Sequence, residues 1–63
     1  MNIGKQIRMA MTDRGIASAD LAKQMGVSRQ TVYRWRMSED LKWSTIMRFC
    51  DGVGITPVQL VNY

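Results

Sequence analysis

One short stretch of the chain carries four side chains that are suited to contacts with nucleic-acid bases: Arg29, Gln30, Tyr33 and Arg34. Arginine and glutamine can form paired hydrogen bonds with the edges of guanine and adenine, and an aromatic ring can lie along a sugar or a thymine methyl group. At about 100° per residue of an α-helix, these side chains share one arc, whereas Val32 and Trp35 fall on the opposite side. The pattern therefore predicts a helix that is buried on one face and able to read base edges with the other.

A second short helix is predicted directly before this one. Ser18 is expected to be its N-cap, because a serine hydroxyl can accept a hydrogen bond from a free amide of the first turn. Asp20 suits the positive end of the helix dipole. The helix should then begin near Ala19 and end at Gly26, since glycine readily adopts the left-handed conformation that terminates helices. Its apolar face is expected to comprise Leu21, Ala22 and Met25.

The connection between the two predicted helices is very short. Gly26 forms the turn, and Val27 is expected to anchor that turn to the core. Ser28 is expected to cap the next helix, which begins at Arg29. Two helices joined at a sharp angle by about three residues, the second presenting polar side chains, are typical of a helix-turn-helix that reads the DNA major groove.

The motif resembles the lambda-repressor/Cro-type helix-turn-helix family of phage and bacterial transcriptional regulators. The matching residues are Asp20-Leu21-Ala22, Gly26-Val27-Ser28, Thr31-Val32 and Trp35. Residues 54–60 are similar to the start of the family's last helix. The resemblance implies that the first, second and sixth residues of the second motif helix read bases, which are Arg29, Gln30 and Arg34. It also implies that Ser18 contacts a DNA phosphate.

The N-terminal segment predicts another amphipathic helix. Asn2 is its expected cap, and Arg14-Gly15 is its expected end. Its apolar face comprises Ile3, Ile7, Ala10 and Met11. Its opposite side carries Lys5, Arg8 and Thr12.

Two more helices are predicted near the C-terminus. One is expected to begin at Ser44, just after Trp43, with an apolar stripe of Ile46, Phe49, Cys50 and Val53. The other begins at Thr56-Pro57-Val58-Gln59, which combines a capping box with a proline at the first helical position. No alternating strand pattern is present, so residues 1–63 are expected to form one domain with an all-α, compact five-helix lambda-repressor-like fold.

The segment after the predicted reading helix departs from the family pattern. Family members often carry lysine or arginine there, whereas this chain has Glu39 and Asp40. We expect both acids to face solvent, and Lys42 and the amides near Ser44 to contact DNA phosphates instead. Ser28 is a further expected phosphate contact.

The composition argues against several other classes of site. Nine Lys and Arg against five Asp and Glu give a net charge of +4, which suits a polyanionic partner. A single cysteine, Cys50, and the absence of histidine predict no metal site and no intrachain disulfide. No nucleophile–base pair or carboxylate pair has supporting spacing, so we expect no enzyme activity and no cofactor. No apolar run approaches the roughly 20 residues that cross a bilayer, and a reducing cytoplasm is the expected location.

These features predict a sequence-specific regulator of transcription that binds double-stranded DNA through the major groove. One reading helix covers few base pairs, so we expect a near-palindromic operator and a homodimer, formed in solution or only on DNA. The expected subunit contact is the apolar C-terminal segment with Val58, Leu60, Val61 and Tyr63, together with Trp43.

Two other functions use the same residues differently. An antitoxin or a restriction–modification controller protein of this fold would also bind an operator, and an antitoxin would hold a protein partner through Trp43 or the C-terminal helix. A module that binds only proteins would need no exposed Arg29, Gln30 and Arg34. Trp43 itself has two interpretations, a cover over the core or a protein contact.

Overall fold

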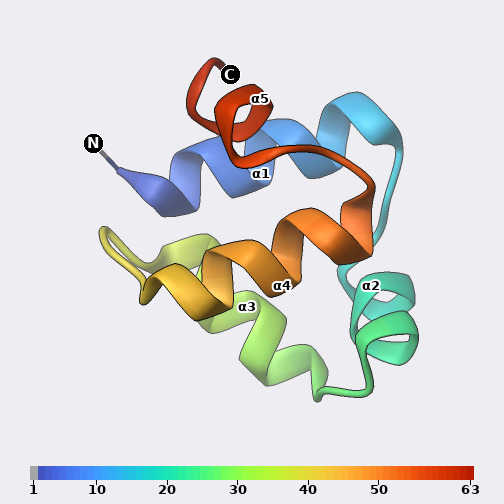
Figure 1. The fold of residues 1–63 in the computed structure, drawn as a ribbon. Helices are drawn as coiled ribbons and strands as arrows, with labels where there is room; N and C mark the ends of the chain where they lie inside the picture. Colours follow the sequence, from blue (N-terminus) through green and yellow to red (C-terminus); the bar gives the residue numbers. More distant parts are fainter. Residues whose placement is uncertain (1) are drawn as a thin grey trace.

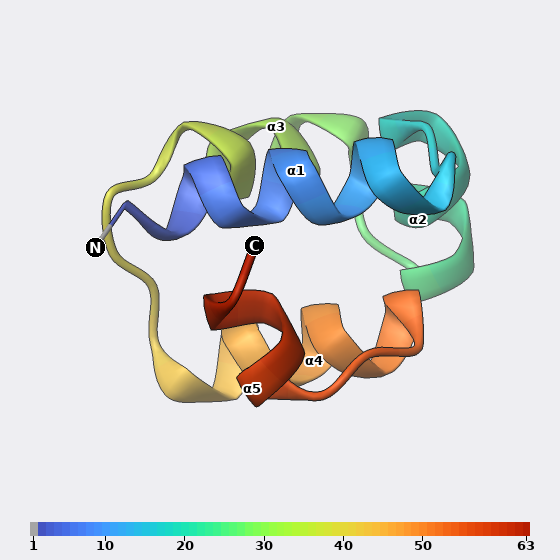
Figure 2. The same cartoon turned by 90° about the horizontal axis from the view of Figure 1, so that it is seen from above.

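The computed structural model describes residues 2–63, which form five α-helices. These are α1 (Ile3–Arg14), α2 (Ser18–Met25), α3 (Arg29–Met37), α4 (Trp43–Val53) and α5 (Pro57–Val61). In Figure 1, α4 lies in front of α1 and α3, and α2 packs across one end of the bundle. The view from above shows α4 and α5 on the side opposite to α1 and α3 (Figure 2). The predicted all-α, five-helix fold is confirmed.

The core draws on every helix. The largest fully buried side chains include one from each helix in turn: Ile7, Leu21, Val32, Phe49 and Leu60. The apolar faces predicted for α1 and α4 are buried in this core, except that Ile46 is only partly buried. Leu60 was expected at the subunit contact, and this expectation is wrong, because its side chain is fully enclosed within the domain.

Capping groups fix the ends of the helices much as the sequence predicts. The side chains of Asn2 and Ser28 accept hydrogen bonds from amides in the first turns of α1 and α3, and Thr56 forms the predicted capping box with Gln59. Gly26 has φ 71° and ψ 31°, and its amide donates to carbonyls in the last turn of α2. This left-handed residue lets the chain turn sharply from α2 into α3.

Two helices begin one residue earlier than predicted. Helix α2 starts at Ser18, so Ser18 is not its N-cap. The N-cap is Ala17, which has an extended backbone conformation (φ −80°, ψ 151°) and no side-chain hydrogen bond to the first turn. The Ser18 hydroxyl instead accepts a hydrogen bond from Arg36 Nη1 at 2.9 Å, because a charged donor from α3 faces it. Trp43 was expected to precede its helix, but it is the first residue of α4, and Lys42 is the N-cap.

The start of α1 packs against the end of α3. The Gly4 amide donates to the Ser38 carbonyl at 2.8 Å, and the Ile3 amide donates to the Glu39 carbonyl at 3.2 Å. A Cβ atom at Gly4 would lie 2.6 Å from the Ser38 oxygen and closer still to the Arg36 oxygen. The absence of a side chain at Gly4 therefore sets how closely α1 and α3 approach.

The C-terminal segment is attached to α1 by polar contacts. Gln6 Nε2 donates to the carbonyls of Leu60, Val61 and Tyr63, the last at 2.7 Å. The Tyr63 hydroxyl donates to Asp13 Oδ2 at 2.6 Å. These bonds attach the short helix α5 and the residues after it to α1, and the two helices are neighbours in Figure 1.

None of the helices within residues 2–63 combines the length and apolar character needed to span a membrane.

Candidate nucleic-acid interface

Helix α3 presents two different faces. Val32 is fully buried and Trp35 is 7% exposed, so this face belongs to the core. On the other face Tyr33 is 58% exposed. The remaining exposed side chains there are Arg29, Gln30, Arg34 and Met37. The predicted division of α3 into a buried and an exposed face is confirmed.

The first turn of α3 is ordered by a small polar network. Ser28 Oγ accepts the Thr31 amide at 3.1 Å and lies 2.9 Å from Thr31 Oγ1. Arg34 Nη2 donates to the same Thr31 hydroxyl at 3.3 Å. Thr31 therefore links the cap of the helix to one of the predicted base-reading arginines. The spacing of three residues between Thr31 and Arg34 is the only sequence signal for this contact.

Positive charge is concentrated on α3. The helix contains Arg29, Arg34 and Arg36 and has no acidic residue in its sequence. Glu39 and Asp40 follow in the next loop and are both exposed, as predicted. The Asp40 carboxylate accepts the Leu41 amide at 2.9 Å. A surface of this kind attracts a phosphate backbone and offers hydrogen-bond donors to base edges.

The predicted phosphate contacts lie at the beginnings of three helices. Ser18 is the half-buried first residue of α2, and Ser28 is the exposed cap of α3. Lys42 and Ser44 are exposed at the start of α4. First-turn amides at these positions can contribute to anion binding together with the side chains.

Comparison with known protein families decides the class of this arrangement. Residues 6–63 of the 63-residue chain match the Cro/C1-type HTH DNA-binding domain. The chain belongs to this family. The resemblance seen in the sequence is thus confirmed, and α2 and α3 are the two helices of the helix-turn-helix. A comparison with curated proteins found no match.

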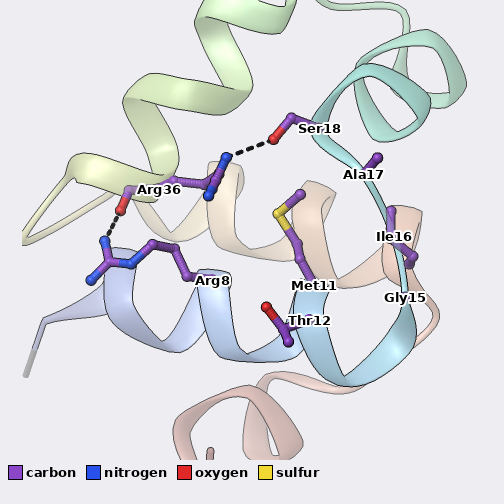
Figure 3. A pocket seen from close by; sticks show the side chains of 8 residues that line it. All are labelled: Arg8, Met11, Thr12, Gly15, Ile16, Ala17, Ser18 and Arg36. Carbon is purple, nitrogen blue, oxygen red and sulfur yellow. Dashed lines mark hydrogen bonds between the residues drawn. The ribbon is translucent and has the colours of Figure 1, made fainter.

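This Cro/C1-type domain also contains a pocket that the sequence did not predict. The pocket has a volume of about 350 Å³ and lies between α1, the start of α2 and the end of α3 (Figure 3). We call it the arginine pocket, and its lining comprises Arg8, Met11, Thr12, Gly15, Ile16, Ala17, Ser18 and Arg36. Arg8 Nη1 donates to the Arg36 carbonyl, and Arg36 in turn donates to Ser18. These three residues are far apart in the sequence, and no local pattern connects them.

The residues predicted at a subunit contact differ in accessibility. Val58 is 67%, Trp43 63% and Val61 42% exposed. Tyr63 is half-buried, packs against the core and is bonded to Asp13. Trp43 does not cover the core, so that interpretation is wrong, and its role in a protein contact stays a prediction.

The Cro/C1-type domain has a single thiol, which lies in the core. The Cys50 side chain is 2% exposed, and burial raises the pKa of its thiol. A protonated, enclosed thiol packs as a small apolar group. In the described part of the chain, no three His, Cys, Asp or Glu side chains come together to hold a metal ion.

Proposed function

We propose that this domain is a sequence-specific regulator of transcription that recognises double-stranded DNA by placing α3 in the major groove. The observation that carries the proposal is the exposed face of α3. Arg29, Gln30 and Arg34 lie there outside the core, while Val32 and Trp35 hold the opposite face in place. Side chains that are free of packing on a rigidly anchored helix are suited to direct readout of base edges.

Within the groove, each exposed side chain has its own role. Arg34 and Gln30 read base edges, Arg29 lies at the N-terminus of α3 within reach of a base or a phosphate, and Tyr33 contacts a sugar or a thymine methyl group. The first motif helix crosses the DNA backbone in this mode of docking. The phosphate contacts that we propose are Ser18, Ser28, Lys42 and Ser44.

The regulator acts as a homodimer on a near-palindromic operator. One α3 helix covers only a few base pairs, and two copies related by a two-fold axis reach half-sites about 34 Å apart. The residues that we propose for the subunit contact are Val58, Val61 and Trp43, which are exposed, together with the half-buried Tyr63. Occupancy of the operator then blocks or redirects RNA polymerase.

Selection of bound duplexes from a random DNA pool tests this function. The expected result is an enriched inverted repeat whose half-sites are about one helical turn apart. A pool that shows no enrichment over its starting composition would contradict sequence-specific binding. Enrichment of a single asymmetric half-site at every protein concentration would contradict the dimer and leave base reading intact.

A further inference from the structure

Arg34 is held by a neighbour on its own helix. Its Nη2 atom donates to the Thr31 hydroxyl at 3.3 Å, across one turn of α3. Thr31 is half-buried between the two faces of the helix, whereas Arg34 is exposed. Because α3 contains no acidic residue, no carboxylate on this helix competes for the guanidinium. The hydroxyl of Thr31 is therefore the side-chain group on α3 that restrains this arginine.

The Thr31 hydroxyl is itself fixed in place. Its oxygen lies 2.9 Å from Ser28 Oγ, and Ser28 Oγ accepts the Thr31 amide at 3.1 Å as the cap of α3. The branched Cβ atom leaves a helical threonine few χ1 rotamers, so a hydroxyl that also contacts the cap cannot turn freely. Because a guanidinium can only donate, Thr31 Oγ1 is the acceptor in the bond with Arg34. This acceptor is thus anchored to the first turn of α3.

The direction of this contact bears on base reading. Thr31 is the third residue of α3 and Arg34 the sixth, so the bond draws the guanidinium toward the N-terminus of the helix. In a helix-turn-helix, the N-terminal part of the second helix makes the contacts with base edges. The guanidinium has several N–H donors, and the bond to Thr31 uses one of them. The others remain available for paired hydrogen bonds with a guanine edge.

We propose that Thr31 is a positioning residue for base recognition, whose hydroxyl holds Arg34 ready to read a base before DNA binds. The inference rests on the proposed function, because it assigns Arg34 to a base edge. An arginine side chain loses rotamer freedom on binding, and one that is already held loses less, so the contact strengthens binding to the base pair that Arg34 reads. At 3.3 Å the bond is longer than the usual range of about 2.7–3.2 Å, so we expect a modest effect. Thr31 acts through Arg34 and makes no base contact of its own.

The test measures base preference at each position of the selected operator. Arg34→Ala identifies the base pair that Arg34 reads, because the preference is lost there. Thr31→Val removes the hydroxyl and keeps the branched shape, so it should lower the preference at that same base pair by about two- to tenfold. Thr31→Ser restores a hydroxyl and should recover most of the preference. In the Arg34→Ala background, Thr31→Val should have no further effect on base preference.

Thr45→Val is the matched control. Thr45 is the third residue of α4, is half-buried like Thr31, and precedes Arg48 by the same three residues. This variant should leave every base preference unchanged. Thermal melting shows whether each variant folds, and Thr31→Ala, which also lacks the hydroxyl and favours a helix more, replaces Thr31→Val if that variant does not.

A second measurement needs no DNA. The NMR order parameter of the Arg34 Nε–H group should be lower in Thr31→Val than in the wild type, because the side chain has lost its acceptor. The order parameter of the exposed Arg48 should be the same in both proteins. An Arg34 order parameter that did not change would contradict the restraint by Thr31.

The outcomes on DNA separate this inference from the proposed function. A wild-type protein that selects its operator, with a folded Thr31→Val variant that keeps full preference at the Arg34 base pair, would overturn the positioning role and leave the proposed function standing. Equal losses in Thr31→Ser and Thr31→Val, or a further loss in the Arg34→Ala background, would also overturn it, because the Thr31 hydroxyl would then not act through Arg34. An Arg34→Ala variant that kept every base preference would do the same. The absence of any selective DNA binding would overturn both proposals.

Discussion

The two faces of α3 are under different physical constraints. Val32 and Trp35 on one face are buried among side chains from the other helices, so their size and shape determine where α3 lies. Gln30 and Arg34 on the other face are exposed, and the core would be unchanged without them. One face of this helix therefore contributes to the stability of the domain, and the other leaves its side chains open to a partner. Substitutions on the buried face should therefore lower the free energy of unfolding, whereas substitutions on the exposed face should lower the affinity for DNA and leave stability nearly unchanged.

The largest expected effect is on the buried face. Trp35→Ala should lower the free energy of unfolding by roughly 3–5 kcal/mol, because it leaves a cavity where α3 meets the core. At roughly 0.05–0.15 kcal/mol per residue, a domain of 63 residues has a total stability of only about 3–9 kcal/mol, so this variant should lose most of its stability. Thermal melting followed by circular dichroism measures the change. A native-like melting temperature would mean that Trp35 does not anchor α3.

A second effect concerns the approach of α1 to the end of α3. Gly4→Ala should lower the free energy of unfolding by roughly 1–3 kcal/mol or more, because the new methyl group would overlap backbone oxygens that cannot move independently. Gly52→Ala is the matched control within α4. Its Cβ would meet the flexible Met25 side chain at 3.0 Å, and alanine favours a helix more than glycine does. Urea denaturation of both variants compares them, and equal stabilities would contradict the close α1–α3 contact.

A third effect tests whether every exposed residue near α3 is free of structural constraint. Ser28 is exposed, but it caps the helix, so Ser28→Ala should cost about 1 kcal/mol of unfolding free energy. Gln30→Ala, two residues away on the open face, should change stability by about 0.5 kcal/mol or less. Chemical denaturation distinguishes the two. A Gln30→Ala variant that lost as much stability as Ser28→Ala would contradict the claim that the exposed face of α3 does not contribute to stability.

The smallest effect separates contacts with phosphates from contacts with bases. Lys42→Ala should weaken binding to operator and scrambled duplex by similar factors and reduce the salt dependence of binding by about one unit of slope. Ser18→Ala should also weaken both duplexes similarly, but it should leave the slope unchanged, because serine is uncharged. Titrations at several salt concentrations measure both quantities. Loss of affinity for the operator alone would reassign Lys42 to base readout.

Local features of the structure could be predicted from the sequence. The apolar faces of α1, α3 and α4, the caps at Asn2, Ser28 and Thr56, and the turn at Gly26 each depend on residues a few positions apart. Helical periodicity and capping preferences are enough to find features of this kind. The candidate base-reading surface could be predicted in the same way, because it consists of the side chains on the face of α3 opposite to its buried apolar residues.

Contacts between distant residues could not be predicted in this way. The interaction of Arg36 with Ser18, and of Gln6 with the C-terminal carbonyls, depends on how the helices pack. Ser18 shows the consequence: its residue type favours an N-cap, yet a guanidinium from α3 is its hydrogen-bond partner. The need for glycine at position 4 could not be predicted either, because it arises from the contact of α1 with the end of α3 in the folded domain.

The most direct test of base reading by α3 is the ratio of affinities for the selected operator and a scrambled duplex. Arg34→Ala and Gln30→Ala should each lower operator binding by roughly 1–3 kcal/mol and change binding to the scrambled duplex little. The ratio should therefore fall while the melting temperature stays that of the wild type. Unchanged ratios in both variants, with folded proteins, would contradict the proposal that the exposed face of α3 reads DNA sequence.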